Sequence, residues 1–156
     1  MKHAEINGIE FEYPDSFTPL SQVEMSKYYS STTNRWAARA AGQHTIISVG
    51  WTNPLNVLTS FLVSPKSFRE NYEKQYGKSL KGFKRGEDLS FEICGAKAEG
   101  FAFSYEASDT GGAQIGMLIT FSLAKQIYIA ECSSGDTDKA FCGEAFETLL
   151  HSIRMK

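Results

Sequence analysis

The sequence predicts an α+β domain: a mainly antiparallel sheet with an N-terminal hairpin, middle helices and a C-terminal helix packed on the sheet. Apolar residues alternate with period two between Glu87 and Cys132, which is typical of antiparallel strands. From Cys142 to Ile153 they recur instead at the spacing of one helical face. A chain of 156 residues suits one hydrophobic core, so residues 1–156 are predicted to form a single domain.

The first element expected is a β-hairpin over residues 4–13. Asn7-Gly8 is the dipeptide that best tolerates the positive φ angles of a type I′ turn, and apolar residues alternate with glutamates after it. Pro14 and Pro19 then end the ladder, because proline has no N–H to donate.

Residues 16–62 are the least typical stretch, because only four charged side chains accompany many aromatic ones. Residues 43–51 are rich in β-branched side chains and are predicted to form a strand. Residues 36–41 are either the hairpin partner of this strand or a short helix, and we favour the hairpin, with its turn at Gly42.

Two helices are expected next, at 53–62 and 64–76. Each is expected to begin with a residue that caps helices well, followed by a proline at the first helical position. The missing N–H of proline costs nothing at that position. In the second helix three aromatic residues share one face, and Gly77 is expected to end it. These residues are Phe68, Tyr72 and Tyr76.

Four antiparallel strands are expected between residues 87 and 132. Cys94-Gly95, residues 109–112 and Ala124-Lys125 have the composition of the turns between them. After residues 133–136 a closing helix is predicted to pack on the sheet.

The composition argues against several classes of protein. The chain has 16 basic and 18 acidic residues, so it lacks the basic excess that a nucleic-acid binder uses to neutralise phosphates. No apolar run is long enough to span a membrane, and no secretory signal is recognisable at the start, so a cytoplasmic location is expected. The three cysteines have no metal-ligand spacing and are expected to be free thiols.

No catalytic or metal-binding constellation is recognisable, and no cofactor is expected. Asp109-Thr110-Gly111 matches the triplet of aspartic proteases, but Ser108 and Gly112 flank it between two predicted strands, which indicates a surface turn. His44 could act with Cys94 or Cys132 as a nucleophilic dyad, although nothing in the sequence brings them together.

The residues that we expect to bind a partner are mostly aromatic, because such side chains give large contact areas at small entropic cost. They are Tyr28, Tyr29, Trp36, Arg39 and Trp51. Core packing accounts for most of these aromatic residues, and the alternative is that Trp36 with one of the tyrosines lines a recognition groove. A second, basic cluster surrounds Phe83, and a solvated strand face is its simpler interpretation. It comprises Lys78, Lys81, Lys84 and Arg85.

The order of elements also resembles a known family. An opening hairpin leads into Tyr13-Pro14-Asp15-Ser16-Phe17, a strand, a middle helix and a meander with Gly95 at a turn follow, and the last helix closes on His151-Ser152-Ile153-Arg154. This order resembles the PsbP-like superfamily of α/β/α sandwiches. That group includes the photosystem II extrinsic subunit, the Ran-binding nuclear-import factor, bacterial DcrB-like lipoproteins and cytosolic chaperones of type VI secretion effectors. Without a signal or lipobox cysteine, the chaperone role is the one that the resemblance implies.

Two functions therefore remain open. The first is a non-enzymatic binding module, such as a cytosolic adaptor or chaperone, that takes a protein or peptide partner into a groove. The second is a small-molecule or anion-binding or enzymatic domain that uses His44, Arg39 and the cluster from Lys81 to Arg85. The first requires an exposed apolar groove, whereas the second requires a closed pocket of polar groups with perturbed pKa values.

Overall fold

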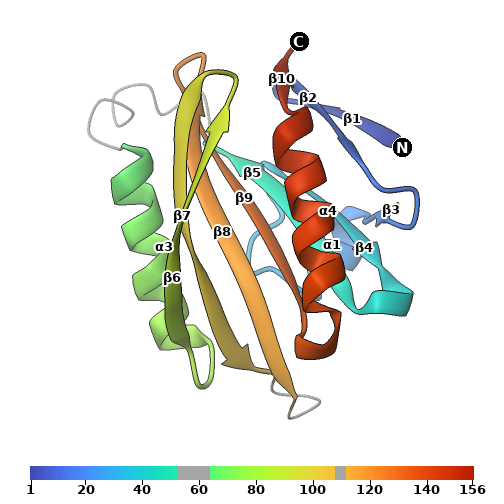
Figure 1. The fold of residues 1–156 in the computed structure, drawn as a ribbon, viewed down its shortest axis with the longest axis vertical. Helices are drawn as coiled ribbons and strands as arrows, with labels where there is room; N and C mark the ends of the chain where they lie inside the picture. Colours follow the sequence, from blue (N-terminus) through green and yellow to red (C-terminus); the bar gives the residue numbers. More distant parts are fainter. Residues whose placement is uncertain (53–63, 108–111) are drawn as a thin grey trace.

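The computed structural model describes residues 1–52, 64–107 and 112–156, and the strands in these ranges form two sheets (Figure 1). The smaller sheet has the order β1-β2-β10 and the larger one the order β3-β4-β5-β9-β8-β7-β6. All neighbouring strands are antiparallel. The strands are β1 (Lys2–Ile6), β2 (Ile9–Tyr13), β3 (Thr18–Pro19), β4 (Arg35–Ala40), β5 (Thr45–Trp51), β6 (Lys84–Ile93), β7 (Ala96–Glu106), β8 (Ala113–Leu123), β9 (Gln126–Gly135) and β10 (Arg154–Met155).

The N-terminal hairpin is confirmed. Its turn has φ angles of 41° at Asn7 and 86° at Gly8, the left-handed conformation that this dipeptide tolerates. The chain's last strand, β10, pairs with the free edge of β2, so the two ends of the chain share one sheet. Strand β10 could not be predicted from the sequence, because two exposed residues have no periodicity to detect.

The alternative that we favoured for residues 36–41 is confirmed, since β4 and β5 form an antiparallel hairpin. The chain reverses through a single 3₁₀ turn, η1 (Ala41–Gln43), and His44 completes the reversal with a φ of 45°. The short strand β3 pairs with the outer edge of β4, and the short helix α1 (Gln22–Met25) follows it.

Helix α3 (Pro65–Ser79) begins where predicted. Ser64 and Ser67 form a reciprocal capping box, with proline at the start of the first turn. The prediction that Gly77 ends this helix was wrong, because the helix continues through it to Ser79 and ends before Leu80. The helix predicted at 53–62 lies outside the described residues.

The predicted meander is confirmed as β6 to β9. Positive φ angles at Cys94-Gly95 and at Ala124-Lys125 mark two of the three turns, and most of the third lies outside the described residues. The closing helix is α4 (Lys139–Ser152), after the single turn η3 (Asp136–Asp138).

Helices cover both faces of the larger sheet (Figure 1). Helix α4 and strand β2 bury the main core against one face, in which Phe11, Phe121 and Phe146 are each almost fully buried. Helix α3 packs its aromatic stripe on the other face, over Phe101 and Phe103. The fold is therefore the α/β/α sandwich that the element order predicted.

None of the helices in the described ranges is long and apolar enough to cross a membrane.

Candidate functional site

An open cleft with a volume of about 780 Å³ lies at the end of the larger sheet where β5 begins and where β7 and β9 end. Its walls come from elements far apart in the sequence: residues 27–28, the end of β4, the C-terminal end of α3 with residues 80–81, and η3. In Figure 1 this is the lower end of the sheet. Because several elements converge on one hollow, the cleft is the strongest candidate for a binding site in the described part of the chain.

The sheet provides the floor of the cleft. Arg39 on β4 is in register with Ile46 on β5, and Ile46 with Ser133 on β9, so the three side chains project from the same face. Tyr105 on β7 and Leu80 after α3 add apolar surface opposite Arg39. The floor is thus a row of polar and apolar groups that crosses the strands.

Charges of both signs surround this floor. Lys81 and Glu106 form an ion pair of 3.8 Å between Nζ and Oε2. Arg39 places its guanidinium over the ring of Tyr28, 5.8 Å from the centroid, and forms no ion pair with any described residue. Asp136 and Asp138 likewise have no basic partner in the described ranges. The cleft therefore offers charges of each sign that no described residue pairs.

The structure divides the five residues predicted to bind a partner. Tyr28, which is 47% exposed, and Arg39 line the cleft. Tyr29 packs under the guanidinium of Arg35, whose Cζ lies 4.1 Å from the ring centroid. The remaining two, Trp36 and Trp51, are partly buried and pack against the main core.

Trp36 and Arg35 are neighbours on β4, so their side chains project from opposite faces of the sheet. The ring centroid of Trp36 lies 4.9 Å from that of Phe11 and 4.9 Å from that of Tyr13. Trp36 therefore does not share a groove with the tyrosines, because strand alternation directs it towards the small sheet.

The second set of predicted residues is also divided. His44 and Lys81 line the cleft together with Arg39. Arg85 lies elsewhere, on β6, where it pairs with Glu73 and Asp88. Phe83 packs on the aromatic stripe of α3. The cluster from Lys81 to Arg85 is therefore not one surface.

A polar cluster that the sequence analysis missed lies beside the cleft, between α3 and residues 29–35. Tyr76 on α3 donates a hydrogen bond to the carboxylate of Glu131 on β9. Arg35 reaches Ser48 on β5 at 3.5 Å, and its buried Nε has no hydrogen-bond partner within the described ranges. The sequence did contain a signal, because Glu131 is the only charged residue within the apolar strand 127–132.

Burial dominates the electrostatics of this cluster. It raises the pKa of the Glu131 carboxyl, although the hydrogen bond from Tyr76 and the nearby Arg35 guanidinium act in the opposite direction. Burial also raises the pKa values of Tyr29, Tyr76 and Tyr105, and the neighbouring Glu131 charge adds to this effect. Since Tyr105 also lines the cleft, the cluster forms the polar layer behind the cleft wall.

Among the described residues, the geometry places neither Cys94 nor Cys132 in contact with His44 as a nucleophile beside its base. The His44 side chain forms no hydrogen bond with any described group, so nothing orients it as a catalytic base would be oriented. Cys132 lies on the α4 side of the sheet, with its Sγ 3.1 Å from that of Cys142. Cys94 donates to the carbonyl of Ile153. The structure therefore brings neither cysteine to His44. The triplet Asp109-Thr110-Gly111 lies outside the described residues.

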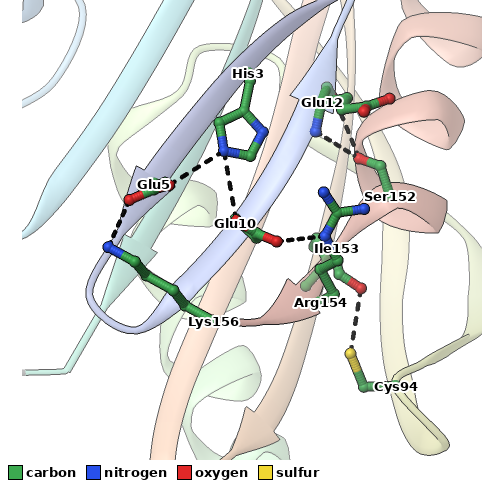
Figure 2. Close-up of polar contacts among 9 residues, drawn as sticks. All are labelled: His3, Glu5, Glu10, Glu12, Cys94, Ser152, Ile153, Arg154 and Lys156. Carbon is green, nitrogen blue, oxygen red and sulfur yellow. Dashed lines mark hydrogen bonds and ion pairs between the residues drawn. The ribbon is translucent and has the colours of Figure 1, made fainter.

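Figure 2 shows a separate polar network on the outer surface of the small sheet. His3, Glu5 and Glu10 place ligand-type atoms within 4.8 Å of one another, as metal ligands would. Both carboxylates already have cationic partners, since Lys156 pairs with Glu5 at 2.6 Å and Arg154 pairs with Glu10. This network therefore ties the last strand to the N-terminal hairpin by ion pairs.

No protein-family model matches the sequence, and no curated protein matches it. Solved structures do match in fold. The cyanobacterial PsbP of Synechocystis sp. PCC 6803 has a TM-score of 0.61 at 10% identity, covering 99% of this chain and 92% of that one. LpqN, described as involved in cell envelope biogenesis of Mycobacterium tuberculosis, has a TM-score of 0.58 at 14% identity, covering 95% and 83%.

A Pseudomonas aeruginosa protein of unknown function has a TM-score of 0.53 at 13% identity, covering 94% of this chain and 91% of that one. At such identities these likenesses concern the fold alone. The chain has the PsbP-like fold, which the sequence analysis predicted from the order of elements.

Proposed function

We propose that the protein is a non-enzymatic binding module, a cytoplasmic adaptor or chaperone, that holds an extended segment of a protein partner in the cleft between residues 27–28 and the end of α3. The observation that carries this proposal is the exposed Tyr28 beside the guanidinium of Arg39, which has no ion-pair partner in the described part of the chain. Tyrosine and arginine are enriched among the residues that dominate binding energy at protein interfaces.

The composition of the cleft favours a peptide as its occupant. Apolar groups of Ile46, Leu80 and Tyr105 lie beside unpaired charges of both signs. A peptide segment presents apolar side chains, charges and backbone amides together, and it can match all three kinds of surface. Because the cleft is open, a long chain can also enter and leave it.

The absence of an oriented base among the described residues supports binding rather than catalysis. Groups with raised pKa values, such as Glu131 and Tyr76, do mark functional sites in some enzymes. Here they hydrogen-bond to each other between α3 and the sheet, which is an arrangement that holds elements together.

A selection from a peptide library tests this proposal. Random twelve-residue peptides displayed on phage are selected on the wild-type protein, and binding of the enriched peptides is measured with Tyr28→Ala. We expect Tyr28→Ala to weaken binding at least tenfold. Val23→Ala is the matched control, because Val23 is an exposed apolar residue that is 74% exposed and does not line the cleft. Enriched peptides that bind Tyr28→Ala as tightly as the wild type would refute the cleft as the site.

A small acidic ligand is the second candidate, because Arg39, His44 and Lys81 all line the cleft. Its volume also falls within the range of roughly 300–1,000 Å³ that is usual for small-molecule sites. Thermal-shift screening with small carboxylates and phosphates distinguishes the two candidates. Stabilisation by such anions, together with failure of the peptide selection, would favour the second.

A further inference from the structure

We infer that the partner segment carries an acidic residue that pairs with Arg39 and, about four residues along the chain, a basic residue that pairs with Asp136 or Asp138. This inference rests on the proposed function and specifies the chemistry of the partner. It follows from the placement of the unpaired charges in the cleft.

The acidic position follows from Arg39. Its guanidinium lies over the ring of Tyr28 and forms no ion pair with a described residue, so its in-plane N–H donors are available to a ligand. A carboxylate can accept two of these donors side by side, and such charge-assisted pairs are stronger than neutral hydrogen bonds. Lys81, by contrast, is already paired with Glu106 and is less available.

The basic position follows from the turn η3. Asp136 and Asp138 line the cleft and have no basic partner within the described ranges. Asp138 precedes α4, but its side chain forms no capping hydrogen bond, so helix formation does not occupy this carboxylate. The two aspartates therefore favour a lysine or arginine of the ligand.

The spacing follows from the strand order. Arg39 lies on β4 and Asp136 follows β9, and these strands flank β5, so the two sites are two strand spacings apart, about 10 Å. β9 also continues for two residues beyond Ser133, the position in register with Arg39, and Asp136 follows in η3, which together add about 9 Å in the strand direction. The diagonal is about 13 Å, which an extended chain spans in about four residues.

A spacing of four also satisfies the orientation of the ligand's side chains. Successive side chains of an extended chain point to opposite sides, so only residues an even number apart face the same surface. Both charges can therefore face the cleft at a spacing of four, whereas at a spacing of five one of them faces solvent.

Synthetic peptides test the inference directly. Fluorescein-labelled ten-residue peptides of alternating leucine and serine carry one aspartate and one lysine four positions apart, in either order. Fluorescence anisotropy measures Kd against a matched peptide with asparagine and glutamine, and against peptides with a spacing of five. We expect one order at a spacing of four to bind at least tenfold more tightly than the neutral peptide and the spacing-five peptides.

Variants of the protein assign each charge. Arg39→Gln should lower affinity for the charged peptide to that of the neutral one, and the double variant Asp136→Asn, Asp138→Asn should act likewise. Arg39→Glu should prefer a peptide with lysine in place of the aspartate. Lys66→Gln is the control, because Lys66 is exposed on the first turn of α3 and does not line the cleft.

The outcomes separate this inference from the function on which it rests. If the charged peptides bind no better than the neutral one while library-selected peptides still depend on Tyr28, the inference is wrong and the proposed function stands. If no peptide of either origin depends on Tyr28, the proposed function fails as well. An unchanged affinity of Arg39→Gln for the charged peptide also overturns the inference.

Discussion

Replacing Trp36 by alanine separates a core role from a binding role. The side chain packs edge-on against the rings of Phe11 and Tyr13, between β4 and the small sheet. Its neighbour Arg39, three residues along the same strand, projects towards the cleft instead. We therefore expect Trp36→Ala to reduce folding stability and Arg39→Ala to reduce partner binding.

The expected loss of folding stability in Trp36→Ala follows from the surface area that the side chain buries and from its two ring contacts. A tryptophan side chain that packs in the way Trp36 does buries about 150 Å² of surface. At about 25 cal/mol per Å², this burial contributes about 4 kcal/mol to the free energy of unfolding. The alanine side chain that remains retains about 1 kcal/mol of this. The two edge-on pairs add about 0.5 to 1.5 kcal/mol each, and part of this is regained when the neighbouring rings relax. The expected cost is about 3 to 4 kcal/mol.

Urea unfolding followed by circular dichroism measures this cost, with Arg39→Ala as the comparison. The arginine lies on an open cleft, so its replacement should change the free energy of unfolding by less than about 1 kcal/mol. The affinity of folded Trp36→Ala for library-selected peptides should equal that of the wild type. A stability cost below about 1 kcal/mol, with a tenfold loss of affinity, would refute the placement of Trp36 in the core.

The remaining predictions concern packing, pH and thiol access. Gly100→Ala should destabilise the folded protein by several kcal/mol, because the added Cβ would lie 1.7 Å from a carbonyl oxygen of the adjacent strand. Gly143→Ala should stabilise α4 by about 0.5 to 1 kcal/mol, because no atom lies within 4 Å of the position that its Cβ would take. Urea unfolding measures both effects. Burial raises the pKa of Glu131, so the folded state holds the carboxyl proton more tightly than the unfolded state does. The stability of the wild type should therefore fall as pH rises above the ordinary pKa of glutamate, and the stability of Glu131→Gln should fall less. Equal slopes of unfolding free energy against pH for the two proteins would contradict the raised pKa of Glu131. Ellman's reagent should label only the exposed Cys94 in the native protein and all three thiols after unfolding. Rapid labelling of Cys132 or Cys142 in the native protein would contradict their burial.

The elements that sequence analysis predicted correctly are those with strong local signals. Asn7-Gly8 dictates a turn by its backbone preferences, and the alternation between residues 87 and 132 dictates strands by burial of one face. The end of α3 was misplaced because the helix continues through Gly77 to Ser79, where Leu80 packs on the aromatic cluster and its N–H donates to the carbonyl of Tyr76, although glycine usually favours a stop. Tertiary contacts outweighed a local preference there.

The candidate site could be predicted only in part. Tyr28, Arg39, His44 and Lys81 were singled out for their chemistry, but the sequence does not reveal which of them meet. Strand alternation places Trp36 on the opposite face of the sheet from Arg39, and which of the two residues borders the cleft depends on the register of β4. Asp136 and Asp138 were missed, because carboxylates before a helix are common and carry no sign of a cleft.

The cleft is tested most directly by mapping a bound peptide on the protein by NMR. The tightest peptide from the library selection is titrated into ¹⁵N-labelled protein, and the amide shifts are followed residue by residue. We expect the largest changes around the cleft, at Tyr28, Ile46, Leu80 and Gln114, and no change on the small sheet. Changes concentrated on β1 and β2, or on the outer edge of β6, would refute binding in the cleft.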